Sequence, residues 1–89
     1  MDKDLLMNVL KVIKEGRQTE LNNVPFKARE EILKFAIKEK LVDGLRSTKD
    51  SVVGDPRITL KGLDYFNSNK KSTKFYETLK EIRDWIPGY

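Results

Sequence analysis

The stretch Arg57-Ile58-Thr59-Leu60-Lys61-Gly62-Leu63-Asp64-Tyr65-Phe66 changes character from strand to helix within a few residues. Thr59 can end a strand and cap a helix, because its hydroxyl can accept a backbone N–H of the turn that follows. Leu63 and Phe66 are three residues apart and therefore share one face of that helix. Gly62, in the first turn, permits close packing of the helix. The stretch predicts a strand that leads directly into a short helix over residues 60–68.

Residues 41–59, which lead into this helix, predict a β-hairpin. Residues 41–48 read as a first strand, and the turn residues of 49–56, with Gly54-Asp55-Pro56 among them, are typical of a tip. A short second strand is then expected over 57–59. Val52 and Val53 stand side by side at the predicted tip, where adjacent apolar residues indicate packing onto a neighbour or a partner.

Two amphipathic helices are predicted before the hairpin. The first covers residues 3–15, with Asp2 or Asp4 as N-cap and Gly16 just past its end. The second covers residues 25–40 and begins at Pro25, because proline suits the first helical position. At about 100° per residue, its core side consists of Phe26, Ile32, Leu33, Ala36 and Ile37. On the opposite side, three lysines lie within about 40° of each other: Lys27, Lys34 and Lys38.

A last helix is predicted over residues 73–86, before Pro87-Gly88 ends it. Its apolar stripe consists of Phe75, Leu79, Ile82 and Ile86. Tyr76, Trp85 and Tyr89 add aromatic area beyond what a minimal domain needs. This helix either packs back on the first helix and completes the core, or forms the interface of a homodimer.

The composition restricts the function more than it identifies it. The chain has 89 residues, enough for one domain, with 18 basic and 14 acidic residues and a net charge of +4. It contains no Cys and no His, which excludes thiol nucleophiles, imidazole bases and Cys/His zinc sites. We therefore expect a binding protein, not an enzyme, with no cofactor and no metal. The N-terminus has no uninterrupted apolar run, so we expect no secretory signal, no membrane partner and a cytoplasmic location.

The order of these elements resembles a winged helix-turn-helix with an additional C-terminal helix. The run from Arg57 to Phe66 is similar to the segment (I/L)-T-x-K-G-x-x-(Y/F)-(L/F), at which the wing returns into a helix in bacterial winged-helix proteins. The stretch from Phe75 to Ile86 resembles the final helix of the YjcQ-like family, small proteins of Gram-positive bacteria and their prophages. The resemblance implies a mainly α, winged-helix fold with a small hairpin, but no established activity. One departure is that only residues 17–24 separate Gly16 from Pro25, so the second helix of the motif is a single turn or absent.

Double-stranded DNA is the partner that the charge pattern favours. The candidate contacts are the outward lysines of the second helix and the basic residues of the hairpin: Lys27, Lys34, Lys38, Arg46, Lys49 and Arg57. The alternative is an ordinary solvated helix face and charges that protect a strand edge. Glu30 and Glu31 weaken the DNA hypothesis, and Arg29, which could contact guanine, points toward the buried side. We therefore expect little sequence preference.

A protein-interaction module on the same scaffold is the second hypothesis, since winged helices serve both uses. Phe35 lies on the outward side of the second helix, where it either meets the wing or marks a contact surface. The candidate partner contacts are Phe35, Val52, Val53, Tyr76 and Trp85.

Overall fold

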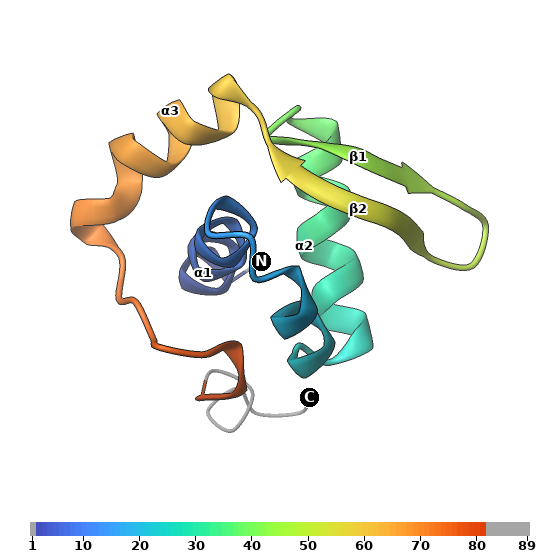
Figure 1. Cartoon of the computed structure of the whole chain (residues 1–89), viewed down its shortest axis with the longest axis horizontal. Helices are drawn as coiled ribbons and strands as arrows, with labels where there is room; N and C mark the ends of the chain where they lie inside the picture. The colour runs from blue at the N-terminus through green and yellow to red at the C-terminus, as the bar shows by residue number, and fades with distance from the viewer. Residues whose placement is uncertain (1, 82–89) are drawn as a thin grey trace.

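The structure, a computed structural model, describes residues 2–81 (Figure 1). The elements follow in the order α1 (Lys3–Lys14), η1 (Gln18–Asn23), α2 (Phe26–Lys38), β1 (Val42–Ser47), β2 (Val52–Ile58), α3 (Leu60–Asn69) and η2 (Lys70–Ser72), where η denotes a 3₁₀ helix. The two strands form one antiparallel sheet. The predicted fold class, mainly helical with a small hairpin in winged-helix order, is confirmed. None of the helices within residues 2–81 is long and apolar enough to cross a membrane.

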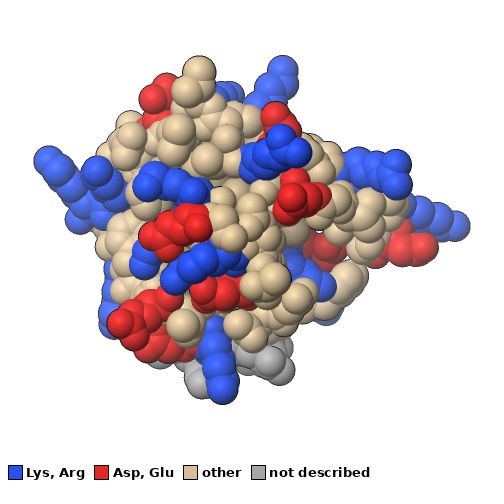
Figure 2. Space-filling view, in the orientation of Figure 1, with Lys and Arg blue, Asp and Glu red and all other residues tan. Residues whose placement is uncertain are grey.

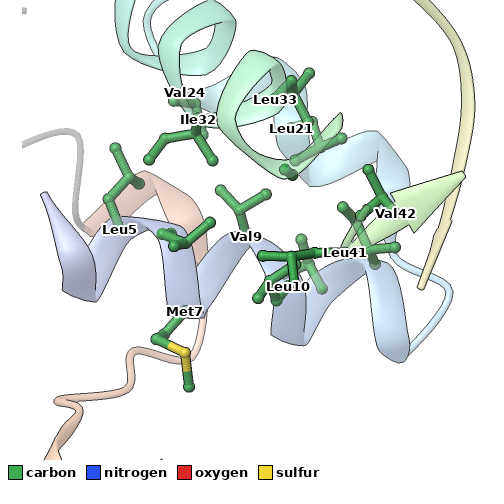
Figure 3. Packing of buried hydrophobic residues seen from close by; sticks show 14 of the residues in the cluster. Leu5, Met7, Val9, Leu10, Leu21, Val24, Ile32, Leu33, Leu41 and Val42 are labelled. Carbon is green, nitrogen blue, oxygen red and sulfur yellow. The ribbon is translucent and has the colours of Figure 1, made fainter. Parts of the chain in front are cut away.

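The central element is α1, which lies between α3 and α2 (Figure 1). Residues 5–10 are all buried, so the middle of α1 is enclosed on every side. Leu5 and Val9 point toward Ile32 of α2, whereas Met7 points away from α2 toward the C-terminal segment (Figure 3). The protein therefore has one core arranged around α1.

The helix ends follow local rules with one exception. Asp2 caps α1, since its Oδ1 accepts the N–H of Leu5 at 3.0 Å. Gly16 ends α1 with a positive φ, as predicted. At the end of α2 the same left-handed position is taken by Lys40, at φ 59°, and the N–H of Leu41 donates to the carbonyl of Ala36 at 2.8 Å. The prediction of helix from 25 to 40 was therefore too long, because Pro25 is the N-cap and Lys40 is already outside.

The hairpin differs from the prediction in its second strand. β2 begins at Val52, so Gly54, Asp55 and Pro56 lie inside a strand and the tip consists of residues 48–51 only. The register shifts between Asp43 and Leu45, where the ladder is irregular. Both Gly44 and Gly54 have positive φ there, and a Cβ on either would clash with the backbone of the opposite strand. Pro56 has no partner in the register, and a bulge is a position at which a strand tolerates proline.

Thr59 joins β2 to α3 as predicted. Its hydroxyl accepts the N–H of Gly62 at 2.9 Å and donates to the carbonyl of Lys40 at 2.7 Å. The cap therefore also fixes the start of α3 against the end of α2.

The predicted helix over residues 73–86 is wrong in its first part. Residues 73–78, which we call the strap, are not helical; helix begins at Leu79, and residues 82–86 lie outside the described part of the chain. Side chains of earlier elements bind the strap's backbone. Asn8 donates to the carbonyl of Lys74 at 3.0 Å and accepts the N–H of Tyr76 at 2.9 Å, and Lys11 donates to the carbonyl of Tyr76 at 3.2 Å. These bonds replace those of a helix.

Candidate nucleic-acid interface

The predicted lysine stripe of α2 is exposed. Lys27, Lys34 and Lys38 are all accessible, and none of them forms an ion pair within residues 2–81. The helix rise of 1.5 Å per residue places the first and last Cα about 16 Å apart along the axis. Because Ile32 and Ala36 face the core, the stripe points away from α1. α2 therefore presents a row of three exposed ammonium groups.

Glu30 does not belong to this exposed row, contrary to the sequence-based expectation. Only 8% of the residue is accessible, and its carboxylate accepts the N–H of Val52 at 2.9 and 3.3 Å. This bond fastens the hairpin to the flank of α2, and Gln18 adds a second attachment by donating to the carbonyl of Pro56 at 3.1 Å. The acidic residue left beside the lysines is Glu31, which is exposed.

Glu30→Ala should destabilise the protein by about 1–3 kcal/mol, because the partly buried N–H of Val52 would lose its acceptor. Glu30→Gln keeps an amide oxygen at the same place and should retain most of that stability. Urea denaturation of both variants measures the difference. Equal losses in the two variants would show that the hydrogen bond does not hold the hairpin.

The hairpin contributes less net positive charge than its basic residues suggest. Arg57 is directly opposite Asp43 in the register, so opposite charges face each other across the strands. Arg46 is opposite Val53, and Lys49 lies in the tip beside Asp50. With Asp55, the hairpin holds three acidic and three basic side chains, all exposed. The structure places the predicted contacts on α2 and on the adjacent hairpin, and the α2 lysines have one acidic neighbour, Glu31, against three basic side chains.

Phe26 is a surface residue that the helical periodicity misassigned to the core. It is 54% exposed, and the guanidinium of Arg29 lies 5.7 Å from its ring centroid. Both residues line a cleft of about 410 Å³ between η1, α2 and the hairpin, together with Leu33 and Val52. Arg29 also donates to the carbonyl of Leu21 at 3.4 Å. The guanidinium of Arg29 is thus engaged in contacts within the protein, with Leu21 and Phe26.

Most of the predicted partner contacts are not free apolar side chains. Phe35 and Val52 are half-buried against the core, which agrees with the alternative that they pack within the protein; Val53 is exposed at 36%. Tyr76 is half-buried in the strap, not on a helix. Trp85 lies outside the described residues. Leu60, the first residue of α3, is 82% exposed and was missed, because a single position at a helix start has no periodicity to reveal it.

Neither the curated proteins nor the solved structures include a match to this chain. A family model described as YjcQ protein matches residues 6–85, which span every helix and strand of the domain except the first turn of α1. The chain therefore belongs to the YjcQ family.

Proposed function

We propose that the protein binds duplex DNA with little sequence preference, through the lysine stripe of α2 with a smaller contribution from the hairpin. The observation that carries the proposal is the row of Lys27, Lys34 and Lys38, exposed and without ion pairs within residues 2–81. Lysine acts on phosphates as a point charge, and phosphate contacts supply most of non-specific affinity. The winged-helix order, in which a helix of this kind faces the duplex, supports the same reading.

Two features of α2 support weak discrimination between sequences. The helix carries no Asn or Gln, the residues that pair with adenine, and its one arginine is occupied by Phe26 and by the carbonyl of Leu21. Burial of Glu30 in the hairpin contact removes one of the two carboxylates that would repel phosphates. The resulting protein is a small DNA-binding protein of the regulator type. Its contacts with phosphates contribute more to binding than its contacts with base edges.

The salt dependence of binding tests this function. Log affinity for a mixed-sequence duplex should fall linearly with log salt, at about −0.9 per phosphate neutralised. Lys27→Gln, Lys34→Gln and Lys38→Gln together should flatten the slope by about two to three units. The thermal midpoint should stay nearly unchanged, because exposed lysines contribute little to stability.

The matched control removes the same charge elsewhere, with Lys3→Gln, Lys61→Gln and Lys80→Gln, all at exposed positions. An equal flattening in this control would mean that net charge, not the α2 stripe, drives binding. No complex at roughly 50 mM salt and tens of micromolar protein would reject DNA binding, because non-specific binders have dissociation constants of about 10⁻⁴ to 10⁻⁶ M even at physiological salt.

A protein-interaction role is the second candidate, and exposed Phe26 at the rim of the 410 Å³ cleft favours it. Aromatic anchors beside a cleft are typical of interface hot spots. Phe26→Ala separates the two roles, since it leaves the lysine stripe intact and should not alter the salt slope.

A further inference from the structure

A second group of lysines lies on the other side of α1 from α2. It comes from α1, η2 and the strap, and we call it the α1–α3 lysine surface: Lys11, Lys14, Lys70, Lys71 and Lys74. Four of the five are exposed, and Lys11 is half-buried. The sequence gives no hint of this group, because its members come from segments more than fifty residues apart.

Aromatic packing brings the segments together. The rings of Phe66, on α3, and Phe75, in the strap, are 5.5 Å apart between centroids. Lys14 Nζ lies 5.6 Å from the Phe66 centroid, and Lys11 Nζ lies 5.6 Å from the Phe75 centroid. Lys70 and Lys71 belong to η2, which connects these two aromatic residues along the chain. Two of the five ammonium groups therefore lie over this aromatic pair, and Lys70 and Lys71 lie between the two rings along the chain. Lys74 Nζ lies 5.4 Å from the ring centroid of Tyr76, the residue after Phe75.

The positive charge of this surface is not neutralised locally. None of its five lysines takes part in an ion pair with another residue of the described range, 2–81. The neighbouring Glu15 is 3.2 Å from Arg17 Nε, and Asp64 lines a groove with Glu39 and Leu41 elsewhere on α3. In the view of Figure 2, basic and acidic side chains alternate over most of the face, whereas the blue atoms gather at the left edge, where α3 ends.

The chemistry of the surface favours phosphates over a protein or a bilayer. Lysine is depleted in protein interfaces, whose anchors are aromatic residues and arginine. The large hydrophobic residues exposed within residues 2–81 are Phe26, Val53 and Leu60, none of which belongs to the surface, so it has no side chain to insert into lipid. Phe66 is buried, Phe75 is half-buried, and a lysine lies over each ring, so neither ring is an open platform for single-stranded bases. A duplex, with regularly spaced phosphates, fits these properties.

We propose that the α1–α3 lysine surface binds the phosphates of a second DNA duplex, so that one molecule joins two duplexes. The α2 stripe points away from α1, and α1 separates it from α3, so the two surfaces do not compete for one duplex (Figure 1). The joining of two duplexes rests on the proposed function. The binding of phosphates by the lysine surface does not.

The experiment uses the full chain and two copies of a mixed-sequence duplex. One copy is immobilised and saturated with protein at roughly 50 mM salt, at which electrostatic binding is strong, and a second, fluorescent copy is then offered. The test variant carries Lys14→Gln, Lys70→Gln and Lys71→Gln. Lys11 is left in place because it donates to the carbonyl of Tyr76 in the strap. The control is the variant with Lys3→Gln, Lys61→Gln and Lys80→Gln, and the thermal midpoint of each variant verifies its folding.

Wild type and control should capture the second duplex, and the test variant should lose capture by about ten-fold or more while still binding the first. Unchanged capture by the test variant would overturn the proposal, and would indicate a dimer that uses two α2 stripes. Binding of the first duplex without any capture by wild type would overturn it and leave the proposed function standing. If the variant without the α2 lysines still binds the first duplex, and the variant without Lys14, Lys70 and Lys71 does not, the lysine surface is supported and the proposed function is rejected. Binding to phosphatidylserine vesicles without duplex capture would overturn the proposal in favour of lipid headgroups.

Discussion

Asn8→Ala should destabilise the protein by about 2–4 kcal/mol, because two backbone groups of the strap lose their hydrogen bonds to the Asn8 side chain. Asn8 is 1% exposed and is the one polar residue among the buried positions of α1. Its amide donates to the carbonyls of Asp4, at 2.7 Å, and of Lys74, and its oxygen accepts the N–H of Tyr76. The carbonyl of Asp4 can keep a helical hydrogen bond after the substitution. The carbonyl of Lys74 and the N–H of Tyr76 lie outside any helix, and both lose the bond that Asn8 supplies.

Urea denaturation measures the stability, and hydrogen exchange at the amide of Tyr76 reports on the strap itself. That amide should be protected in the wild type and exchange rapidly in the variant. Asn8→Leu fills the volume but supplies no hydrogen bonds, and it should also destabilise. A stable Asn8→Leu variant would contradict the prediction, since packing alone would then be sufficient. Asn67→Ala, at an exposed position of α3, serves as the control and should change stability by less than about 0.5 kcal/mol.

Gly62→Ala should destabilise the protein by about 1–3 kcal/mol or more, against the direction that helix propensity predicts. Gly62 lies in the first turn of α3, where replacement of glycine by alanine ordinarily favours the helix by about 1 kcal/mol. A Cβ at this position would overlap the backbone carbonyl oxygen of Leu41 and lie 2.8 Å from Cγ1 of Ile58. Backbone atoms cannot move away as the end of a side chain can, so α3 must shift from the hairpin.

The sign of the effect distinguishes the two physical causes. Ser68→Ala, at an exposed position within α3, replaces a side chain and does not add a Cβ, so it should be neutral or slightly stabilising. A Gly62→Ala variant more stable than the wild type in thermal denaturation would contradict the close approach of α3 to Leu41.

Several features were predictable because they depend on neighbouring residues alone. The caps at Asp2 and Thr59 and the helix end at Gly16 depend on hydrogen bonds that reach only three to five residues along the chain. The lysine stripe of α2 follows from helical periodicity, and its exposure agrees with that pattern. Periodicity failed at Phe26, because a position at the edge of a helical face is buried only if another element covers it, and a cleft lies there instead.

The strap and the α1–α3 lysine surface could not be predicted from local pattern. Residues 73–78 have the apolar spacing of a helix, yet Asn8 and Lys11 bind their backbone from more than sixty residues away. A pattern along the chain contains no information on which distant side chain will compete for a backbone group. The same holds for Glu30, whose sequence position indicated a surface carboxylate and whose contact with Val52 buries it.

By itself, the sequence determined the helical class, the hairpin, the junction at Thr59 and the absence of Cys and His chemistry, because each depends on residue type or on short-range spacing. Only the tertiary structure decided which charges remain free. It buried Glu30 against the hairpin and opposed Arg57 with Asp43. It also brought Lys11 and Lys14 over the rings of Phe75 and Phe66, which flank η2 with its Lys70 and Lys71 in the chain. The physical reason is that the electrostatic effect of a side chain depends on its distance from other charges in space, and folding sets those distances.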